Sequence, residues 1–227
     1  MKKIIVTGAS KGIGYAISER LLVNGHEVLG ISRDTSHLNF KGFDCDIQSF
    51  DAIRKVSIEI KKQYGKIDGL INAAGIASMN LALMTPQKVS RNVINTNLLG
   101  TIFSCQNFSP LLIRNKGGII INFSTIAVAL GLKGESVYCA SKAGVEAFSR
   151  SFSREMADFN INVNCIAPGP IKTDLLKGIS DYQINEIVKN QIIKKIFKVE
   201  DVCNMVEILL DEKFSSVSGQ ILHIGGV

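Results

Sequence analysis

The sequence predicts a doubly wound α/β fold (a Rossmann fold), in which a parallel sheet carries helices on both faces. Short apolar, β-branched runs alternate with longer segments whose apolar residues recur at helical spacing. The short runs are apolar on both faces, as expected for parallel strands covered by helices on both sides. No repeat or Pro/Ser-rich linker interrupts the alternation, so we expect a single domain over residues 1–227.

The elements follow in order along the chain. The apolar runs predict strands at Lys3–Val6, Glu27–Ile31, Gly69–Ile71, Ile119–Phe123, Asn162–Ile166 and Gln220–Ile224, with a further strand near Phe40–Cys45. The longer segments contain few internal Gly or Pro residues and predict helices at Ile13–Asn24, Phe50–Tyr64, Thr85–Asn115, Val137–Phe159 and Val199–Asp211.

Composition excludes several classes of protein. No run approaches the roughly 18 apolar residues of a membrane span, and the apolar stretch Ile4–Thr7 is too short for a signal peptide, so we expect a cytoplasmic protein. The net charge of +6 comes from dispersed lysines among few aromatic residues, which argues against nucleic-acid binding. The cysteines lack the spacing of metal or redox motifs and are expected to be reduced core residues, with no metal site: Cys45, Cys105, Cys139, Cys165 and Cys203.

A glycine-rich turn follows the first predicted strand. The segment Thr7–Gly14 leads directly into the first helix and places glycines at positions 8, 12 and 14. Glycine permits the tight turn and leaves room for a pyrophosphate at the backbone N–H groups, while the helix N-terminus favours negative charge. The turn therefore predicts a dinucleotide site, and the alternative is a tight strand-to-helix loop with no ligand.

The end of the second strand bears on the choice of dinucleotide. Folds that bind NAD usually hold an acidic residue here, but this chain has Ser32 and Arg33. Arg33, together with Lys11, would neutralise a 2′-phosphate, so NADP(H) is preferred and NAD(H) is the alternative. Asp34 is the competing feature because it lies close enough to reach a ribose, and Arg33 can also be read as a solvated surface charge.

A second motif is chemical. Tyr138 and Lys142 lie four residues apart on a predicted helix and so project from one face. A nearby ammonium favours the phenolate, so the pair predicts a Tyr138 pKa below the usual value of about 10. Ser124 and Thr125 end the strand that precedes this helix, where a hydroxyl can hydrogen-bond a substrate carbonyl. In the plainer interpretation they are turn residues.

Four motifs then occur in the order found in the short-chain dehydrogenase/reductase family. Thr7–Gly14 resembles its TGxxxGxG motif, Asn72–Gly75 its NNAG motif, Tyr138–Lys142 its YxxxK motif, and Pro168–Gly169 its PG motif. The resemblance covers essentially the whole chain. It implies a nicotinamide-dependent oxidoreductase that acts on CH–OH or C=O groups.

The resemblance also implies residue roles. Tyr138 would donate the proton, Lys142 would lower its pKa and hold the nicotinamide ribose, and Asn97 would order a water for the proton relay. Register from Tyr138 favours Thr125 over Ser124 as the catalytic hydroxyl. Asp46 would bond the adenine amine, Asn72 and Gly75 would line the adenine side, and Ile171 and Thr173 would hold the carboxamide. The full implied cofactor set is Gly8, Ser10, Lys11, Gly12, Ile13, Gly14, Arg33, Asp46, Ile47, Asn72, Ala73, Gly75, Tyr138, Lys142, Pro168, Gly169, Ile171 and Thr173.

One departure from the family pattern bears on chemistry: Thr125 stands where the family has its catalytic serine and offers the same hydroxyl on a stiffer side chain. Three further departures bear on pocket shape and subunit contacts. Val128 stands where many members have glycine, Ala73 replaces the second Asn of NNAG, and Gly225–Val227 replaces the usual Asp-Gly-Gly. Without the resemblance, Asn97 would be read as a helix-surface or capping residue and Asp46 as a turn residue.

Residues 174–198 interrupt the alternation and are predicted to form a substrate lid. The apolar positions of this segment fall at helical spacing and would shield the nicotinamide from water: Ile184, Ile187, Val188 and Ile192. The alternative is a helix packed on the edge of the sheet. Within the family, the C-terminal stretches most resemble 3-oxoacyl-acyl-carrier-protein reductases, and a basic lid suits an acidic carrier.

We therefore expect an NADPH-dependent carbonyl reductase acting on a small carbonyl or acyl substrate, such as a 3-oxoacyl thioester. The alternatives are an NAD(P)-linked sugar or cyclic-alcohol dehydrogenase and a non-catalytic NADP(H) sensor. A homotetramer or homodimer is expected from the family.

Overall fold

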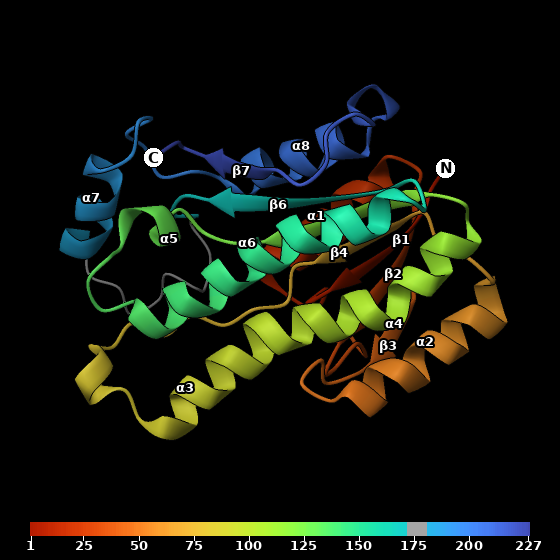
Figure 1. Ribbon diagram of the computed structural model, residues 1–227, viewed down its shortest axis with the longest axis horizontal. Coiled ribbons are helices and arrows are strands. Elements are labelled where there is room, and N and C mark those ends of the chain that lie inside the picture. Colours follow the sequence, from red (N-terminus) through yellow and green to blue (C-terminus); the bar gives the residue numbers. More distant parts are fainter. Residues whose placement is uncertain (172–180) are drawn as a thin grey trace.

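One parallel sheet of seven strands organises the protein (Figure 1). The computed structural model describes residues 1–171 and 181–227, without the side chains of residues 181–183. The strands lie in the order β3-β2-β1-β4-β5-β6-β7, and every pairing is parallel. Their bounds are β1 Lys3–Thr7, β2 Glu27–Ser32, β3 Gly42–Asp44, β4 Gly69–Asn72, β5 Gly118–Phe123, β6 Ile161–Pro168 and β7 Ile221–Ile224. The predicted doubly wound fold is confirmed.

The strand order reverses between β1 and β4. From β1 the chain first builds outward through β2 and β3, then returns to the other side of β1 and continues from β4 to β7. Loops at the carboxyl ends of β1 and β4 therefore diverge to opposite faces and leave a crevice, which is where ligands bind in open α/β sheets.

Helices cover both faces of the sheet. Side chains of α2, α4 and α6 pack on one face, and those of α1 and α8 pack on the other. In Figure 1 the arrowheads of β6 and β7 point toward the side of the molecule that carries α5 and α7. The helix bounds are α1 Gly12–Val23, α2 Phe50–Tyr64, α3 Gln87–Ile94, α4 Gly100–Arg114, α5 Ala127–Leu130, α6 Ser136–Ala157, α7 Asp181–Lys189 and α8 Val199–Leu210, with short turns η1 Ala82–Met84 and η4 Glu212–Phe214.

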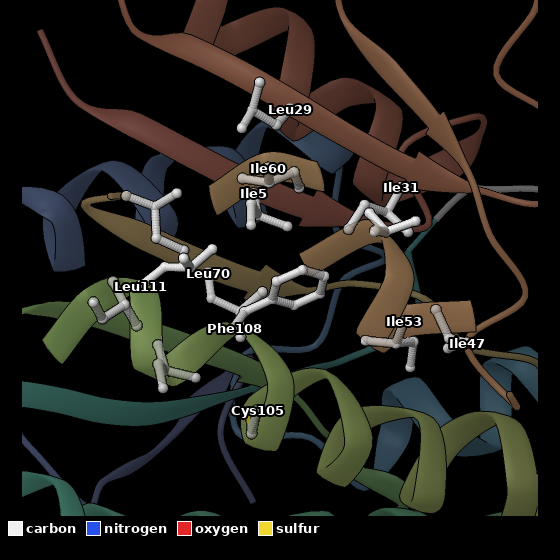
Figure 2. Close-up of a cluster of buried hydrophobic side chains, with 14 of the residues drawn as sticks. Ile5, Leu29, Ile31, Ile47, Ile53, Ile60, Leu70, Cys105, Phe108 and Leu111 are labelled. Atoms are coloured by element: carbon white, nitrogen blue, oxygen red, sulfur yellow. The ribbon is translucent and has the colours of Figure 1, made fainter. Parts of the chain in front are cut away.

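Alternation along the strands divides the core into two layers. Ile5 of β1 and Leu70 of β4 point into the layer under α2, α4 and α6, whereas Ile4 and Ile71 point into the layer under α1 and α8. In Figure 2, Phe108 of α4 lies against the side chains that the sheet sends into the first layer. Both layers consist mainly of buried aliphatic side chains with a few aromatic ones, so the central strands hold the loops at their ends in fixed positions.

The long helix predicted at Thr85–Asn115 is interrupted in the structure. It divides into α3, a π-helical stretch η2 at Asn95–Leu99, and α4. π-Helical turns arise within α-helices and often mark functional positions. Asn97 lies inside this stretch and is 0% exposed, so reading it as a surface or capping residue is wrong.

The predicted lid is only partly described, because residues 174–180 lie outside the described residues. α7 carries Ile184, Ile187 and Val188, of which Ile187 is buried, but the helix ends at Lys189. Ile192 is therefore not part of the helical stripe, and it is exposed. No helix within residues 1–171 and 181–227 is long and apolar enough to cross a membrane.

Candidate active site

The glycine turn after β1 is built by close backbone contacts. Gly8 has a φ of +71°, and a Cβ added to it would lie 2.7 Å from the Cα of Ala74, which follows β4. A Cβ on Gly14 would lie 2.3 Å from the carbonyl oxygen of Gly8. Gly12 also has a positive φ, +59°, but open space around it. The turn thus joins the ends of β1 and β4, where the strand order reverses. It requires glycine either because φ is positive or because a Cβ would collide with neighbouring backbone.

The N-terminus of α1 is open to a ligand. No side chain caps it, and its first turn contains no acidic residue. The Ser10 N–H donates to the Ser32 hydroxyl over 3.1 Å, which ties the turn to the end of β2. Lys11 and Arg33 are both exposed, and no described residue forms a hydrogen bond or ion pair with the Arg33 guanidinium. Asp34, in contrast, accepts bonds from the Ser36 N–H and hydroxyl, which lower its pKa.

Three residues carried over from the family as cofactor contacts have side chains that serve the fold. The Asn72 amide donates to Asn122 Oδ1 over 2.8 Å and to Cys105 Sγ over 3.3 Å, inside the core. The Ile47 side chain is buried against Gly100 of α4. The exposed Asp46 carboxylate accepts from the Gln48 N–H over 3.0 Å. Because the Asn72 and Ile47 side chains face the interior, only their backbones remain for a cofactor.

Gly75 lies at the chemical end of the crevice. A Cβ added there would be 3.3 Å from Asn97 Oδ1 and 3.4 Å from Lys142 Nζ. The loop after β4 thus runs from Ala74, beside the glycine turn, toward α6, and the expected cofactor contact of Gly75 stays a prediction. Ala73 packs on the layer under α1 and α8.

Residues at the end of β6 and directly after it form the far wall of the crevice. The Gly169 N–H donates to Ile224 O over 2.9 Å, and Pro168 O accepts from the Ile126 N–H over 3.1 Å. Ile171 is buried and pairs with Phe197 in an isolated bridge. Thr173 lies outside the described residues. Pro168 and Ile171 thus link the β5 and β6 loops to the chain that follows α7.

Asn97 is held rigidly within the π-helical stretch. Its Oδ1 accepts from the Ile76 N–H over 2.8 Å, and its Nδ2 donates to Ile76 O and to Ser141 Oγ over 2.9 and 3.0 Å. These bonds tie the loop after β4 to α6. The Asn97 carbonyl accepts from the Thr101 hydroxyl over 2.8 Å, and its expected role in a proton relay stays a prediction.

Thr125, rather than Ser124, faces the tyrosine. The Thr125 side chain lowers the pKa of Tyr138 by hydrogen bonding, against the larger opposing effect of burial, and Thr125 Oγ1 accepts from the Ala127 N–H over 3.2 Å. Ser124 points elsewhere, because its hydroxyl donates to Glu146 Oε1 over 2.6 Å. The geometry agrees with the register argument for Thr125.

Lys142 lies one turn beyond Tyr138 on α6 and is only 5% exposed. Its ammonium donates to Phe123 O at the end of β5 over 2.9 Å. Burial lowers the pKa of Lys142 to about 8, since the charged form loses hydration. The lysine is thus close to the boundary between its charged and neutral forms.

The expected low pKa of Tyr138 is wrong for the protein without a ligand. Desolvation by the surrounding protein raises this pKa above 10, and the charge of Glu135 raises it further. The Lys142 ammonium is directed to Phe123 O instead of the phenol. In this state desolvation outweighs the charge attraction inferred from the four-residue spacing, and the phenol stays protonated.

Glu135 is a site residue that the sequence analysis missed. It occupies the N-cap position of α6, three residues before Tyr138, and is 6% exposed. Its carboxyl has no hydrogen-bond or cationic partner among the described residues, and burial raises its pKa. Its position one helical turn before Tyr138 was the available signal.

The arrangement defines a class of protein. A glycine turn at the reversal point of a doubly wound sheet leads into a crevice that ends in a Thr125, Tyr138 and Lys142 cluster, as in dinucleotide-dependent oxidoreductases. The family model for short chain dehydrogenase matches residues 2–184. The chain belongs to the short-chain dehydrogenase family, whose members are nicotinamide-dependent oxidoreductases acting on CH–OH or C=O groups. No group of three or more metal-ligating side chains occurs in the described part of the chain.

Similar proteins cover nearly the whole chain. The 3-oxoacyl-[acyl-carrier-protein] reductase FabG of Staphylococcus epidermidis is 32% identical over 239 residues, which span 99% of this chain and 98% of the relative. FabG of Escherichia coli is 31% identical, with 99% and 96% covered. The ligand-free structure of Thermoplasma acidophilum aldohexose dehydrogenase superposes with a TM-score of 0.89 at 28% identity, covering 99% of this chain and 93% of that one.

The buried Lys142 makes a pH-dependent contribution to stability. Its pKa falls from 10.5 in the free residue to about 8 in the folded protein, so the folded state releases the proton first as pH rises. Stability therefore increases between pH 8 and 10.5, by about 3 kcal/mol for this group alone. Urea unfolding of the wild type and Lys142→Met at a series of pH values measures the difference. If the free energies of unfolding of the two proteins changed with pH in the same way, the lowered pKa of Lys142 would be refuted.

Proposed function

We propose that the protein is an NADPH-dependent carbonyl reductase whose leading substrates are 3-oxoacyl thioesters. The observation that carries the proposal is that Thr125 interacts with the protonated Tyr138 phenol while the buried Lys142 ammonium bonds Phe123 O at the end of β5. Two neighbouring hydroxyl donors would suit a carbonyl oxygen that gains negative charge. The names of the FabG relatives support the substrate class.

The residues present fit a nicotinamide dinucleotide. Gly12 has open space around it and no side chain caps α1, so the first backbone N–H groups of the helix would face a pyrophosphate. Arg33 and Lys11 would hold a 2′-phosphate, and Asp34 is already engaged by Ser36. Ala73, Gly75, Pro168, Gly169 and Ile171 would line the crevice toward the nicotinamide. The bound reduced cofactor supplies the hydride.

The chain's own residues manage the proton and the developing charge. Thr125 and Tyr138 hydrogen-bond the substrate oxygen, and Tyr138 donates its proton as the carbonyl carbon accepts the hydride, which yields the alcohol. The raised pKa of Tyr138 keeps the phenol protonated but also makes it a weaker acid. The Lys142 ammonium, one turn away, stabilises the phenolate that remains and would hold the nicotinamide ribose. Asn97 keeps the Gly75 loop in contact with α6.

Replacing Tyr138 by Phe removes the acid and retains the ring. We expect a loss of about 10²- to 10⁴-fold in kcat with an acetoacetyl thioester and NADPH, because general acid catalysis contributes that much. NADPH affinity, measured by fluorescence titration, should change little. Tyr64→Phe, on α2, is the matched control. Wild-type turnover in the Tyr138→Phe protein would overturn the assigned role.

Arg33→Ala tests the cofactor preference. A charge-assisted hydrogen bond contributes about 1.5–3 kcal/mol, so the KM for NADPH should rise by about 10- to 100-fold while the KM for NADH stays constant. Arg54→Ala, an exposed arginine on α2, serves as the control. A wild-type enzyme that binds NADH more tightly than NADPH would contradict the preference.

A second candidate, the oxidoreduction of a sugar or another hydroxylated substrate, is favoured by Glu135. Its charge acts on Tyr138, and no described side chain donates a hydrogen bond to its carboxyl, which leaves the carboxyl able to accept one from a ligand. A substrate hydroxyl near the reacting carbon would supply one. The similarity to aldohexose dehydrogenase agrees with this reading.

Substitutions of Glu135 distinguish the two candidates. If the substrate is hydroxylated, Glu135→Leu should lower kcat/KM for an aldohexose by about 10- to 100-fold and leave an acetoacetyl thioester unaffected. Glu135→Gln keeps an acceptor and should lose less. A wild-type preference for the thioester, unchanged in Glu135→Leu, would exclude the second candidate. Binding of NADPH without turnover of any carbonyl substrate or alcohol would instead favour a sensor.

Location, assembly and lid action remain part of the proposal. We propose a cytoplasmic homotetramer or homodimer, as expected from the family resemblance. The segment 174–198 would close over the substrate, and the exposed Lys194, Lys195 and Lys198 would face an acidic carrier protein.

A further inference from the structure

Two adjacent hydroxyls at the end of β5 serve different partners. Ser124 and Thr125 directly follow the last residue of β5, and their side chains have different hydrogen-bond partners. Thr125 acts on the phenol, and Ser124 is turned away. Because the two residues are adjacent, the contacts that hold Ser124 in place also restrict the orientation of the Thr125 hydroxyl.

Ser124 is anchored through both its backbone and its side chain. Its N–H donates to Ile166 O over 2.8 Å, which continues the β5–β6 pairing beyond the last strand residue. Its hydroxyl donates to Glu146 Oε1 over 2.6 Å. Ser124 and Glu146 are 5% and 7% exposed, so water does not replace this bond easily.

Glu146 is itself held in place on α6. It lies one turn after Lys142, and its second carboxyl oxygen is 3.7 Å from the Arg150 guanidinium, whose side chain is 55% exposed. Ser124, which bonds Glu146, also donates its N–H to Ile166 O of β6. The carboxylate thus joins α6 to the ends of β5 and β6 directly behind the catalytic groups.

Thr125 depends on this anchor for its orientation. Its Oγ1 accepts from the Ala127 N–H, which leaves the hydroxyl proton free to point at the phenol oxygen or a substrate carbonyl. Ala127 begins α5, so the turn over residues 124–127 is short and transmits any rotation at Ser124 to Thr125.

We propose that Glu146 is a positioning residue: through its hydrogen bond to Ser124 it holds the end of β5 so that Thr125 faces Tyr138. The inference rests on the proposed function only in that Thr125 and Tyr138 bind the substrate carbonyl. It assigns no substrate contact to Glu146 or Ser124.

Kinetics of Ser124→Ala, Glu146→Leu, Glu146→Gln and the Ser124→Ala/Glu146→Leu double variant test the proposal. Misplacing a reacting group by about 1 Å costs up to 100-fold, so we expect kcat to fall by about 10- to 100-fold in Ser124→Ala and Glu146→Leu, with little change in NADPH affinity. Gln retains an acceptor oxygen and should keep kcat within about threefold. The double variant should be no slower than either single variant, since both break one bond. Glu155→Leu, an exposed position on α6, is the control.

Crystal structures of Ser124→Ala and Glu146→Leu give a readout that does not depend on turnover. The proposal expects Thr125 Oγ1 to move away from the Tyr138 hydroxyl in both. It is overturned if Thr125 keeps its place, if kcat is unchanged, or if the two substitutions are additive. Absence of turnover in the wild type with every carbonyl substrate would refute the proposed function instead, and the crystal structures would still decide the role of Glu146. If Glu146→Leu does not fold, Ser124→Ala alone decides.

Discussion

Desolvation of the catalytic pair is the constraint on which the site depends. α6 packs against β5 and β6, so Lys142 is almost wholly buried and Tyr138 is half-buried, with its phenol strongly desolvated. Both groups are driven toward their neutral forms: the pKa of the phenol rises, and that of the ammonium falls to about 8. A neutral phenol is a proton donor, which agrees with the proposed reduction of a carbonyl.

The strand ends bring the parts of the site together. The turn after β1, the loop after β4, the hydroxyls after β5 and the wall after β6 all lie at the carboxyl edge of one parallel sheet. Contacts across this edge are tight: Gly8 touches Ala74, Gly75 touches Asn97 and Lys142, and Ser124 bonds Glu146. Small side chains and buried hydrogen bonds at the strand ends therefore set the geometry, while the aliphatic layers beneath keep it rigid.

Local sequence patterns predicted the features that depend on neighbours in the chain. Strand and helix positions, the glycine turn and the Tyr138–Lys142 spacing all follow from periodicity and short motifs. Features set by contacts between distant segments were wrong or missed: the π-helical stretch around Asn97 and the inward Asn72 side chain. The predicted direction of the Tyr138 pKa shift was wrong for the same reason. The four-residue spacing indicates that the Lys142 charge is near, but it does not indicate how deeply the phenol is buried.

The most direct test is a pH titration of Tyr138 in the unliganded protein, followed by NMR of tyrosine labelled at the carbon that bears the hydroxyl. The chain contains four tyrosines, and the Tyr138→Phe variant identifies the signal. If burial governs the site, the Tyr138 signal stays in the protonated position beyond pH 10. A midpoint below 10 would show that the lysine charge prevails over desolvation and would contradict this account.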